Sequence, residues 1–308
     1  MTRSVFVANA PCSYGAFEIT VGVRDGLPTP TEVLDHIASS GYDGTDLGPP
    51  GWLGEGSELA GRLAARRLGL AGGYLELPFA DPGRMDAALA RLTRLLDTFD
   101  EVRGVLPDVP APKPTLADAG SPSRAANPGR AAREVSLGLD DGGWRRLAEG
   151  VARAVAVCRE RGYEPTFHHH AGTYVEAPWE IERLLELTDV GLCLDTGHLL
   201  LGGGDPLDAL GAWRERINHL HLKDCRLDVV RGIVEERAPI EEIWRRHAFC
   251  RLGEGDLDVD GFLARVRAAG FTGWIVVEQD GIVDEAWPAT RAFADQARNR
   301  GFLRERGL

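Results

Sequence analysis

The amino-acid sequence predicts an α/β fold with the (β/α)₈ architecture of a TIM barrel. Eight apolar, strand-like runs alternate with amphipathic helical patterns along nearly the whole chain, which is typical of a parallel sheet wound with helices. The length of 308 residues suits one such barrel, for which about 250 residues are typical. We therefore expect residues 1–308 to form a single barrel domain. A doubly wound open sheet is the rival architecture.

The predicted strands are short runs rich in apolar residues. They cover residues 4–10, 44–48, 70–77, 114–118 and 164–170, followed by two strands within 191–224 and a last strand at 273–279. The helical patterns between them cover residues 31–40, 57–68, 84–99, 142–161, 177–187, 206–215, 258–269 and 286–300. Gly69 and Gly162 directly follow two of these helices, as expected of residues that end helices.

Two segments depart from this alternation. Residues 101–135 are rich in Pro, Gly, Ala and Ser, which also fits a linker between two domains. We favour a loop excursion that contains the fourth strand and an arginine-bearing loop at 123–133 over the site, because helices and strands resume directly afterwards. A second excursion is expected at 227–250, with a helix at 239–246.

The composition excludes several classes of partner. The net charge is −12, from 35 basic and 47 acidic residues, so nucleic acid and anionic membranes are poor partners. Five cysteines without a CxxC motif indicate reduced thiols and a cytoplasmic location. We find no signal-peptide pattern. No apolar run approaches the length of about 18 residues that a membrane span needs. No GxGxxG follows a predicted strand, and no P-loop motif occurs.

The stretch 191–224 places polar residues at the carboxyl ends of two predicted strands. Period-two alternation puts Asp195 and His221 on matching faces of neighbouring parallel strands, at the edge where α/β folds build their sites. Carboxylate and imidazole suit Mn²⁺, Co²⁺, Fe²⁺, Mg²⁺ or Zn²⁺. The alternative is that Asp195 caps the next helix and that His221 is a hydrogen-bonded core histidine.

The fifth and eighth predicted strands add two more candidate ligands. Alternation through TFHHHAGT and GWIVVEQD turns His168 and Glu278 toward the same edge, if those faces point inward. An inward glutamate is costly unless it is paired or bound to a cation. Together, His168, Asp195, His221 and Glu278 predict a divalent metal site. A buried histidine–carboxylate network without metal is the competing interpretation.

Five sequence blocks carry a resemblance to a known family. FHHHAGT, CLDTGHL, HLHLKDCR, LGEGDLDVDGF and GFTGWIVVEQD occur in this order and resemble the xylose-isomerase-like TIM-barrel superfamily, most of all its inosose dehydratase family. The sugar isomerases and epimerases of that superfamily use a Glu-Asp-His-Glu metal set, whose first position corresponds here to His168. This departure favours dehydration over the isomerase cycle. Segments 10–15 and 116–118 differ from what we expect of inosose dehydratases, which leaves the exact substrate open.

The resemblance implies a metal-dependent hydro-lyase of carbohydrate metabolism, acting in inositol catabolism. It would dehydrate a small keto-cyclitol or keto-sugar through a metal-stabilised enediolate, with Mn²⁺ or Co²⁺ expected and Mg²⁺, Fe²⁺ or Zn²⁺ as alternatives. A keto-sugar isomerase or epimerase, or cleavage of a C-linked 3-keto-sugar, are alternatives for the same site. A non-catalytic carbohydrate-binding barrel would need no metal ligands. The oligomeric state is open between a monomer and a homodimer.

Four residues are candidates for the proton transfers that dehydration requires. Glu278 and His170 are both candidates for the base that removes the proton next to the ketone. His198, Lys223 or His170 would protonate the leaving hydroxyl. Lys223 precedes Asp224 in the sequence, so a structural ion pair between these two residues is an equal alternative.

Further polar residues near the expected rim are candidates for binding substrate hydroxyls. They are His198, Asp46, Glu76, Asp118, Glu176 and Arg251. For each of Asp46, Glu76, Asp118, Glu176 and Arg251 alone, a helix cap or a loop salt bridge is the plainer interpretation.

Overall fold

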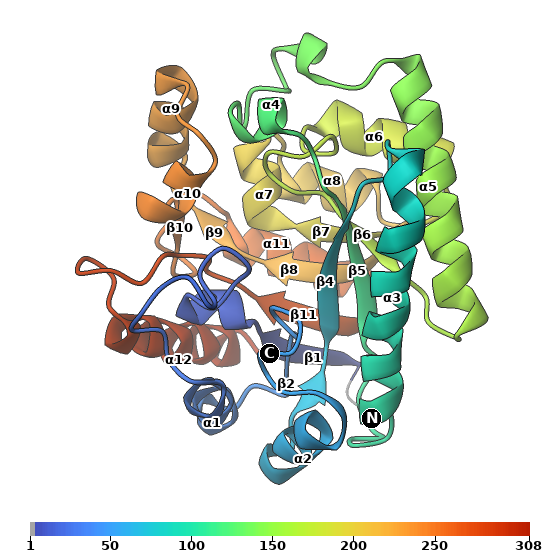
Figure 1. Ribbon diagram of the computed structural model, residues 1–308. Helices are drawn as coiled ribbons and strands as arrows, with labels where there is room; N and C mark the ends of the chain where they lie inside the picture. Colours follow the sequence, from blue (N-terminus) through green and yellow to red (C-terminus); the bar gives the residue numbers. More distant parts are fainter. Residues whose placement is uncertain (1–3) are drawn as a thin grey trace.

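The computed structural model describes residues 4–308 and shows parallel strands in a barrel enclosed by helices (Figure 1). The strand order is β3-β2-β1-β11-β8-β7-β6-β5-β4. The strands are β1 (Val5–Asn9), β2 (Gly44–Thr45), β3 (Gly69–Leu70), β4 (Gly72–Leu77), β5 (Lys113–Asp118), β6 (Thr166–His168), β7 (Gly191–Asp195), β8 (Ile217–Leu222) and β11 (Gly273–Val277). Every neighbouring pair in this sheet is parallel. The predicted fold class is confirmed.

The barrel closes through β3 and β4, which stand at the two ends of the strand order. Only Ala71 separates them in the chain. Its N–H donates to the Thr45 carbonyl at 2.8 Å, and its own carbonyl accepts from the Lys113 N–H at 3.0 Å. The two segments therefore act as one strand between β2 and β5, so the nine strands of the sheet occupy eight positions. The alternative prediction, a doubly wound open sheet, is therefore wrong.

Helices connect the strands and cover the outside of the barrel (Figure 1). They are α1 (Pro30–Ser40), α2 (Gly56–Arg66), α3 (Pro82–Val102), α5 (Asp141–Glu160), α6 (Pro178–Leu187), α8 (Pro206–Ala212), α11 (Val259–Ala268) and α12 (Ala289–Glu305). All eight coincide with helices predicted from the sequence pattern, within a few residues at each end. No helix among residues 4–308 is long and apolar enough to cross a membrane.

Short elements fill the loops at the carboxyl ends of the strands. They are η1 (Pro11–Tyr14), α4 (Pro122–Ala125), η2 (Val135–Leu137), α7 (Thr196–Leu201), β9 (Asp224–Cys225), α9 (Leu227–Glu236), α10 (Glu241–Arg245) and β10 (Phe249–Cys250). The α10 helix was predicted, whereas α7 and α9 were not. The α7 sequence TGHLLL has no polar face, so its periodicity does not distinguish a helix from a strand.

The register of the strands sets the level of each inward side chain. Cys193 on β7 is paired with His168 on β6 and with His219 on β8. Asp195, two residues further along β7, is paired with His221. The polar side chains of neighbouring strands therefore form successive layers inside the barrel, as expected for alternate residues of tilted parallel strands.

The segment 101–135 contributes β5 to the barrel, and a buried arginine anchors the loop that follows. Arg124 donates to Glu180 Oε1 at 2.8 Å and to Glu176 Oε2 at 3.1 Å, and all three side chains are buried. Glu176 Oε1 also accepts the backbone N–H groups of Gly129 and Gly172. These bonds tie the loop after β5 to the loop after β6.

Replacing Arg124 with alanine should destabilise the protein strongly. It would leave two carboxylates buried without their cation, which costs about 3–5 kcal/mol in other proteins. Urea unfolding measures the loss. Arg159→Ala is the control, because Arg159 pairs with Glu164 and Asp189 at the surface, where such pairs contribute about 1 kcal/mol or less. Equal losses in both variants would contradict the anchoring role.

Asp118 makes a second tie at the end of β5. Its Oδ1 accepts the N–H groups of Gly120 at 2.8 Å and Tyr174 at 3.3 Å. Burial raises the pKa of Asp118 to about 6, despite these two bonds. The folded pKa thus exceeds the unfolded value of about 3.9, so the native state binds more protons between these values. This group's contribution to stability therefore falls as the pH rises from about 4 to about 6.

Asp118→Asn should remove this pH dependence, because the amide oxygen still accepts both N–H groups but does not titrate. We compare the unfolding free energy of the variant with that of the wild type at each pH. The difference in favour of the variant should increase by about 2–3 kcal/mol between pH 4 and pH 8. Urea unfolding of the metal-free proteins at several pH values measures this difference. A difference that stays constant with pH would show that the carboxyl is not perturbed.

Candidate functional site

Four side chains meet inside the barrel at the carboxyl ends of neighbouring strands. His168 ends β6, Asp195 ends β7, His221 lies near the end of β8, and Glu278 follows β11. Their ligand atoms all lie within 4.8 Å of one another, and all four residues are buried. His168 Nε2 is 3.4 Å from Asp195 Oδ2, and His221 Nδ1 is 3.1 Å from Glu278 Oε2. The structure thus brings together the four residues that the sequence pattern had suggested as metal ligands.

Several polar atoms of this group lack a hydrogen-bond partner. Within residues 4–308, Asp195 Oδ2, His168 Nδ1 and both ring nitrogens of His221 are buried without a hydrogen bond of ordinary geometry. Buried polar atoms in folded proteins are nearly always hydrogen-bonded. Two imidazoles and two carboxylates are also a donor set that divalent cations accept. The residues therefore fit a bound divalent cation.

Lys223 lies buried among three carboxylates beside the same group. Its Nζ is 2.7 Å from Asp280 Oδ2, 2.9 Å from Glu278 Oε2 and 3.3 Å from Asp195 Oδ2. With the histidines neutral, as metal ligands must be, three ionised carboxylates face one ammonium, which leaves an excess of two negative charges. Because uncompensated buried charge is costly, a divalent cation would balance this cluster.

The pKa shifts follow from these contacts. Burial opposes ionisation of Asp195, but the charges of Lys223 and His198 lower its pKa well below the usual range. Burial opposes ionisation of Glu278 too, and there His221 and Lys223 lower the pKa. For Lys223, burial opposes the charge, but the surrounding carboxylates raise the pKa well above its ordinary value. At neutral pH, Asp195 and Glu278 are ionised and Lys223 is protonated.

Asp195 has two roles at once. Its Oδ1 accepts the backbone N–H of His198 at 2.8 Å and so caps α7, while its Oδ2 faces His168, His221 and Lys223. The helix-cap interpretation is therefore correct, and it does not compete with a place in the cluster. The cap also fixes the position of His198.

His170 and His198 lie next to the cluster, each with its ring centroid 5.5 Å from that of His168. Their ring centroids lie 3.9 Å apart, and Lys223 Nζ is 3.2 Å from His198 Nε2. The 2.9 Å contact between His170 Nδ1 and the Ala171 carbonyl places the ring proton on Nδ1, so Nε2 can accept a proton. Burial lowers the pKa of His170 to about 3, which keeps this imidazole neutral.

The predicted substrate-binding residues lie in different surroundings. Asp46 lies beside the cluster, with a carboxylate oxygen within 4.8 Å of the ring nitrogens of His219 and His221. Burial raises the pKa of Asp46 to about 6. Asp118 lies at the end of β5, where it holds two loop amides.

Glu176 and Arg251 are engaged in contacts with loops and helices. Glu176 is bound by Arg124 and two backbone N–H groups. Arg251 pairs with Glu254 and lies 3.4 Å from Asp295 of α12. Both residues therefore match the plainer interpretation, loop salt bridges, and their contact with substrate stays a prediction.

The suggested ion pair between Lys223 and Asp224 is wrong, because these adjacent residues face opposite sides of the strand. Lys223 points into the barrel, toward Asp195, Glu278 and Asp280. Asp224 instead accepts four backbone N–H groups, those of Cys225, Gly253, Gly255 and Leu257.

Two residues near the cluster had no predicted role. Asp280 binds Lys223, and Cys12 in η1 has its sulfur within 4.8 Å of carboxylate oxygens of Glu278 and Asp280. Asp280 shares the alternating face of Glu278, so the same pattern that selected Glu278 could have selected it. No sequence signal marks Cys12, because it lies in a turn.

A cavity of about 970 Å³ opens at the opposite end of the barrel. It is lined by residues at the amino ends of strands, among them Lys113, Ile217 and Gly273. No member of the buried cluster lines it. We therefore place the candidate site at the carboxyl ends of the strands, on the chemistry of the side chains rather than on the size of the cavity.

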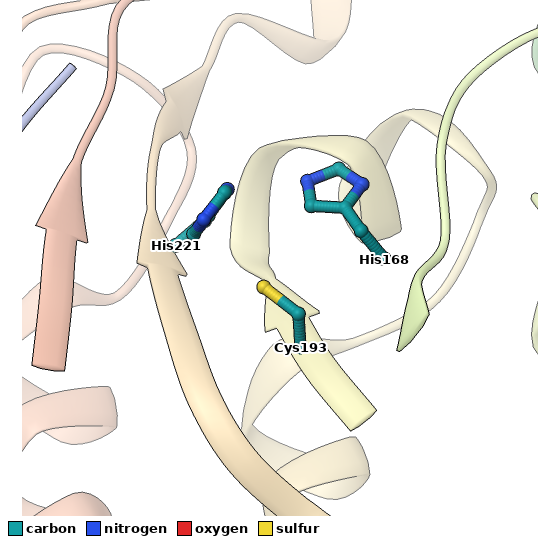
Figure 2. Close-up of side chains that lie close together, drawn as sticks. All are labelled: His168, Cys193 and His221. Atoms are coloured by element: carbon teal, nitrogen blue, oxygen red, sulfur yellow. The ribbon is translucent and has the colours of Figure 1, made fainter. Parts of the chain in front are cut away.

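Figure 2 shows a further residue at the floor of the cluster, Cys193 of β7, whose sulfur points between the rings of His168 and His221. Its ligand atom also lies within 4.8 Å of theirs. Alternation places Cys193 on the same face of β7 as Asp195.

Known proteins resemble this chain in sequence and in fold. The family model described as "Xylose isomerase-like TIM barrel" matches residues 34–305. An inosose dehydratase of Geobacillus kaustophilus is 32% identical over 286 residues, which is 88% of this chain and 88% of that protein. The resemblance inferred from the sequence blocks is confirmed.

Solved structures match the barrel over almost its whole length. A D-allulose 3-epimerase from Methylomonas sp., in complex with D-allulose, has a TM-score of 0.68 at 14% identity and covers 99% of this chain and 98% of its own. The IOLI protein with a bound zinc atom has a TM-score of 0.67 at 13% identity, with 96% of each chain covered. At such identities these structures show the fold alone. The family model and the 32% identical relative show that the chain belongs to the xylose isomerase-like TIM barrel family.

Proposed function

We propose that this protein is a metal-dependent hydro-lyase that removes water from a keto-cyclitol of the inosose type. The observation that carries the proposal is the buried cluster of two imidazoles and two carboxylates, in a chain 32% identical to an inosose dehydratase over 88% of its length. The zinc atom bound to the similarly folded IOLI protein supports a metal in this fold.

His168, Asp195, His221 and Glu278 would hold the cation. When bound, a divalent cation supplies Lewis-acid polarisation of a substrate carbonyl and lowers the pKa of the adjacent C–H. Lys223 balances the carboxylates that face this position. Its charge also keeps Asp195 and Glu278 ionised, as ligands require.

Removal of water needs one base and one acid. A proton leaves the carbon beside the ketone, the hydroxyl on the next carbon leaves as water, and the resulting enol tautomerises to a diketone. His170 suits the base by its position, because it is partly exposed and its Nε2 is free of the ring proton. Glu278 suits it less, because Lys223 and His221 stabilise its ionised form.

Lys223 suits the acid. Its ammonium contacts His198 Nε2 at 3.2 Å. A hydroxyl that approaches this pair could take a proton from Lys223 as it leaves. Asp280, at 2.7 Å from Nζ, positions the ammonium for this transfer.

The first test is the mass of the product formed from 2-keto-myo-inositol. The protein loaded with Mn²⁺ or Co²⁺ should convert it to a product lighter by one water. Asp195→Asn should lose most of this activity while its amide oxygen still caps α7. A product with the same mass as the substrate would indicate isomerisation or epimerisation instead of dehydration. No conversion, by a protein that binds metal tightly, would exclude inosose, and 3-keto-glucosides would be tested next.

His170→Gln should lower kcat for dehydration by about 10²–10⁴-fold, which is typical of the loss of a general base. Metal stoichiometry should not change, because His170 is outside the proposed ligand set. His247→Gln is the matched control, since His247 lies beside Asp284 and Trp287, apart from the cluster. If His170→Gln retains the wild-type kcat, the base is another residue.

A further inference from the structure

Cys193 lies one layer below Asp195 on β7, with its side chain on the same inner face. Its backbone is paired with that of His168, and the residue is completely buried. Figure 2 shows the sulfur on the floor of the cluster, between the two imidazole rings. The thiol is therefore close enough to His168 and His221 to share a cation with them.

Two overlapping donor sets share His168 and His221. One contains Asp195 and Glu278, and the other contains Cys193. Each set keeps its ligand atoms within 4.8 Å of one another. His168 Nδ1 and the ring nitrogens of His221 are buried without a hydrogen bond of ordinary geometry, so one nitrogen of each neutral ring can offer its lone pair to a shared cation.

A buried cysteine is most often a small apolar residue that only packs. Here a ring nitrogen of each of two imidazoles, those of His168 and His221, lies within 4.8 Å of the sulfur. Sulfur and imidazole together favour Zn²⁺ and Co²⁺, whereas carboxylates favour Mn²⁺ and Mg²⁺. The thiol thus adds a donor whose preference differs from that of Asp195 and Glu278.

We propose that Cys193 is a metal ligand, which binds a thiophilic divalent cation together with His168 and His221. The inference rests on the proposed metal site, and it does not depend on the dehydration reaction. On binding, the S–H bond is replaced by a sulfur–metal bond, and the proton passes to the buffer. The site would then hold Zn²⁺ and Co²⁺ more tightly than its oxygen ligands alone.

The absorption spectrum of the full-length protein titrated with Co²⁺ tests the proposal. The wild type should develop a sulfur-to-cobalt charge-transfer band in the near ultraviolet that saturates at one equivalent. Cys193→Ser should lose the band but retain the weaker visible bands of bound Co²⁺. The Kd for Zn²⁺ should rise relative to that for Mn²⁺ by about tenfold or more.

Cys12→Ser is the matched control, because Cys12 also lies close to the cluster, beside Glu278 and Asp280. This variant should keep the full band. A band that disappears with Cys12 rather than with Cys193, or that survives in Cys193→Ser, would overturn the proposal.

X-ray absorption of the wild type loaded with Zn²⁺ needs no variant, so it decides the matter even if Cys193→Ser does not fold. It should show one sulfur at about 2.3 Å, the usual Zn–S distance. A shell of nitrogen and oxygen alone would overturn the role of Cys193 but leave the proposed function standing. No binding of any cation would overturn both, whereas sulfur ligation without dehydration would overturn the reaction alone.

Discussion

The ion cluster around Lys223 is the interaction on which the rest of the site depends. One ammonium, 1% exposed, lies within 3.3 Å of carboxylate oxygens from β7 and from the segment after β11. Breaking such a cluster by removing one partner costs more than replacing all its members, because an uncompensated charge stays buried. Lys223 therefore allows three carboxylates to converge inside an apolar barrel, and it joins strands that are far apart in the sequence.

Asp195 links this cluster to the backbone of the following helix. Because the same carboxylate caps α7 and faces His168, His221 and Lys223, a change of charge at the site also changes the start of the helix. The cap determines where His198 lies, and His198 in turn contacts Lys223. A strand end and a helix cap thus determine the position of two of the proposed acid–base groups, Lys223 and His198.

Period-two alternation was enough to predict the inner residues of the site. His168, Asp195 and His221 lie on strands whose register is determined by the closed barrel, and Glu278 follows a fourth strand. The same rule explains why Lys223 and Asp224 point in opposite directions. Glu176 and Arg251 lie in loops, where direction depends on long-range partners such as Arg124 and Asp295.

The fold could be predicted for a similar reason. Most of the amphipathic helices were recognisable because they present an apolar stripe to the barrel, although α12 also buries Asp295, Gln296, Asn299 and Arg300. In contrast, α7 is buried on nearly every side and so shows no such stripe. The closure between β3 and β4 could not be read from the sequence, because it depends on Ala71 bonding to strands on both sides. The local alternation of the sequence specifies which side chains of a strand point inward. The pairing of strands that are distant in the sequence specifies which other side chains they contact.

The histidine at position 168 changes the charge balance of the site. A glutamate there, as in the isomerase pattern, would bring a further carboxylate beside Asp195 and Glu278. This chain instead has a neutral imidazole next to Asp195, while Asp280 adds a carboxylate on the far side of Lys223. Negative charge is thereby moved from the proposed cation toward the lysine. The ligand set becomes richer in nitrogen, and the ammonium gains the partner that orients it toward His198. For the proposed dehydration, a nitrogen ligand at position 168 and an ammonium directed toward His198 would favour proton delivery to a leaving hydroxyl over proton shuttling by a metal-bound carboxylate.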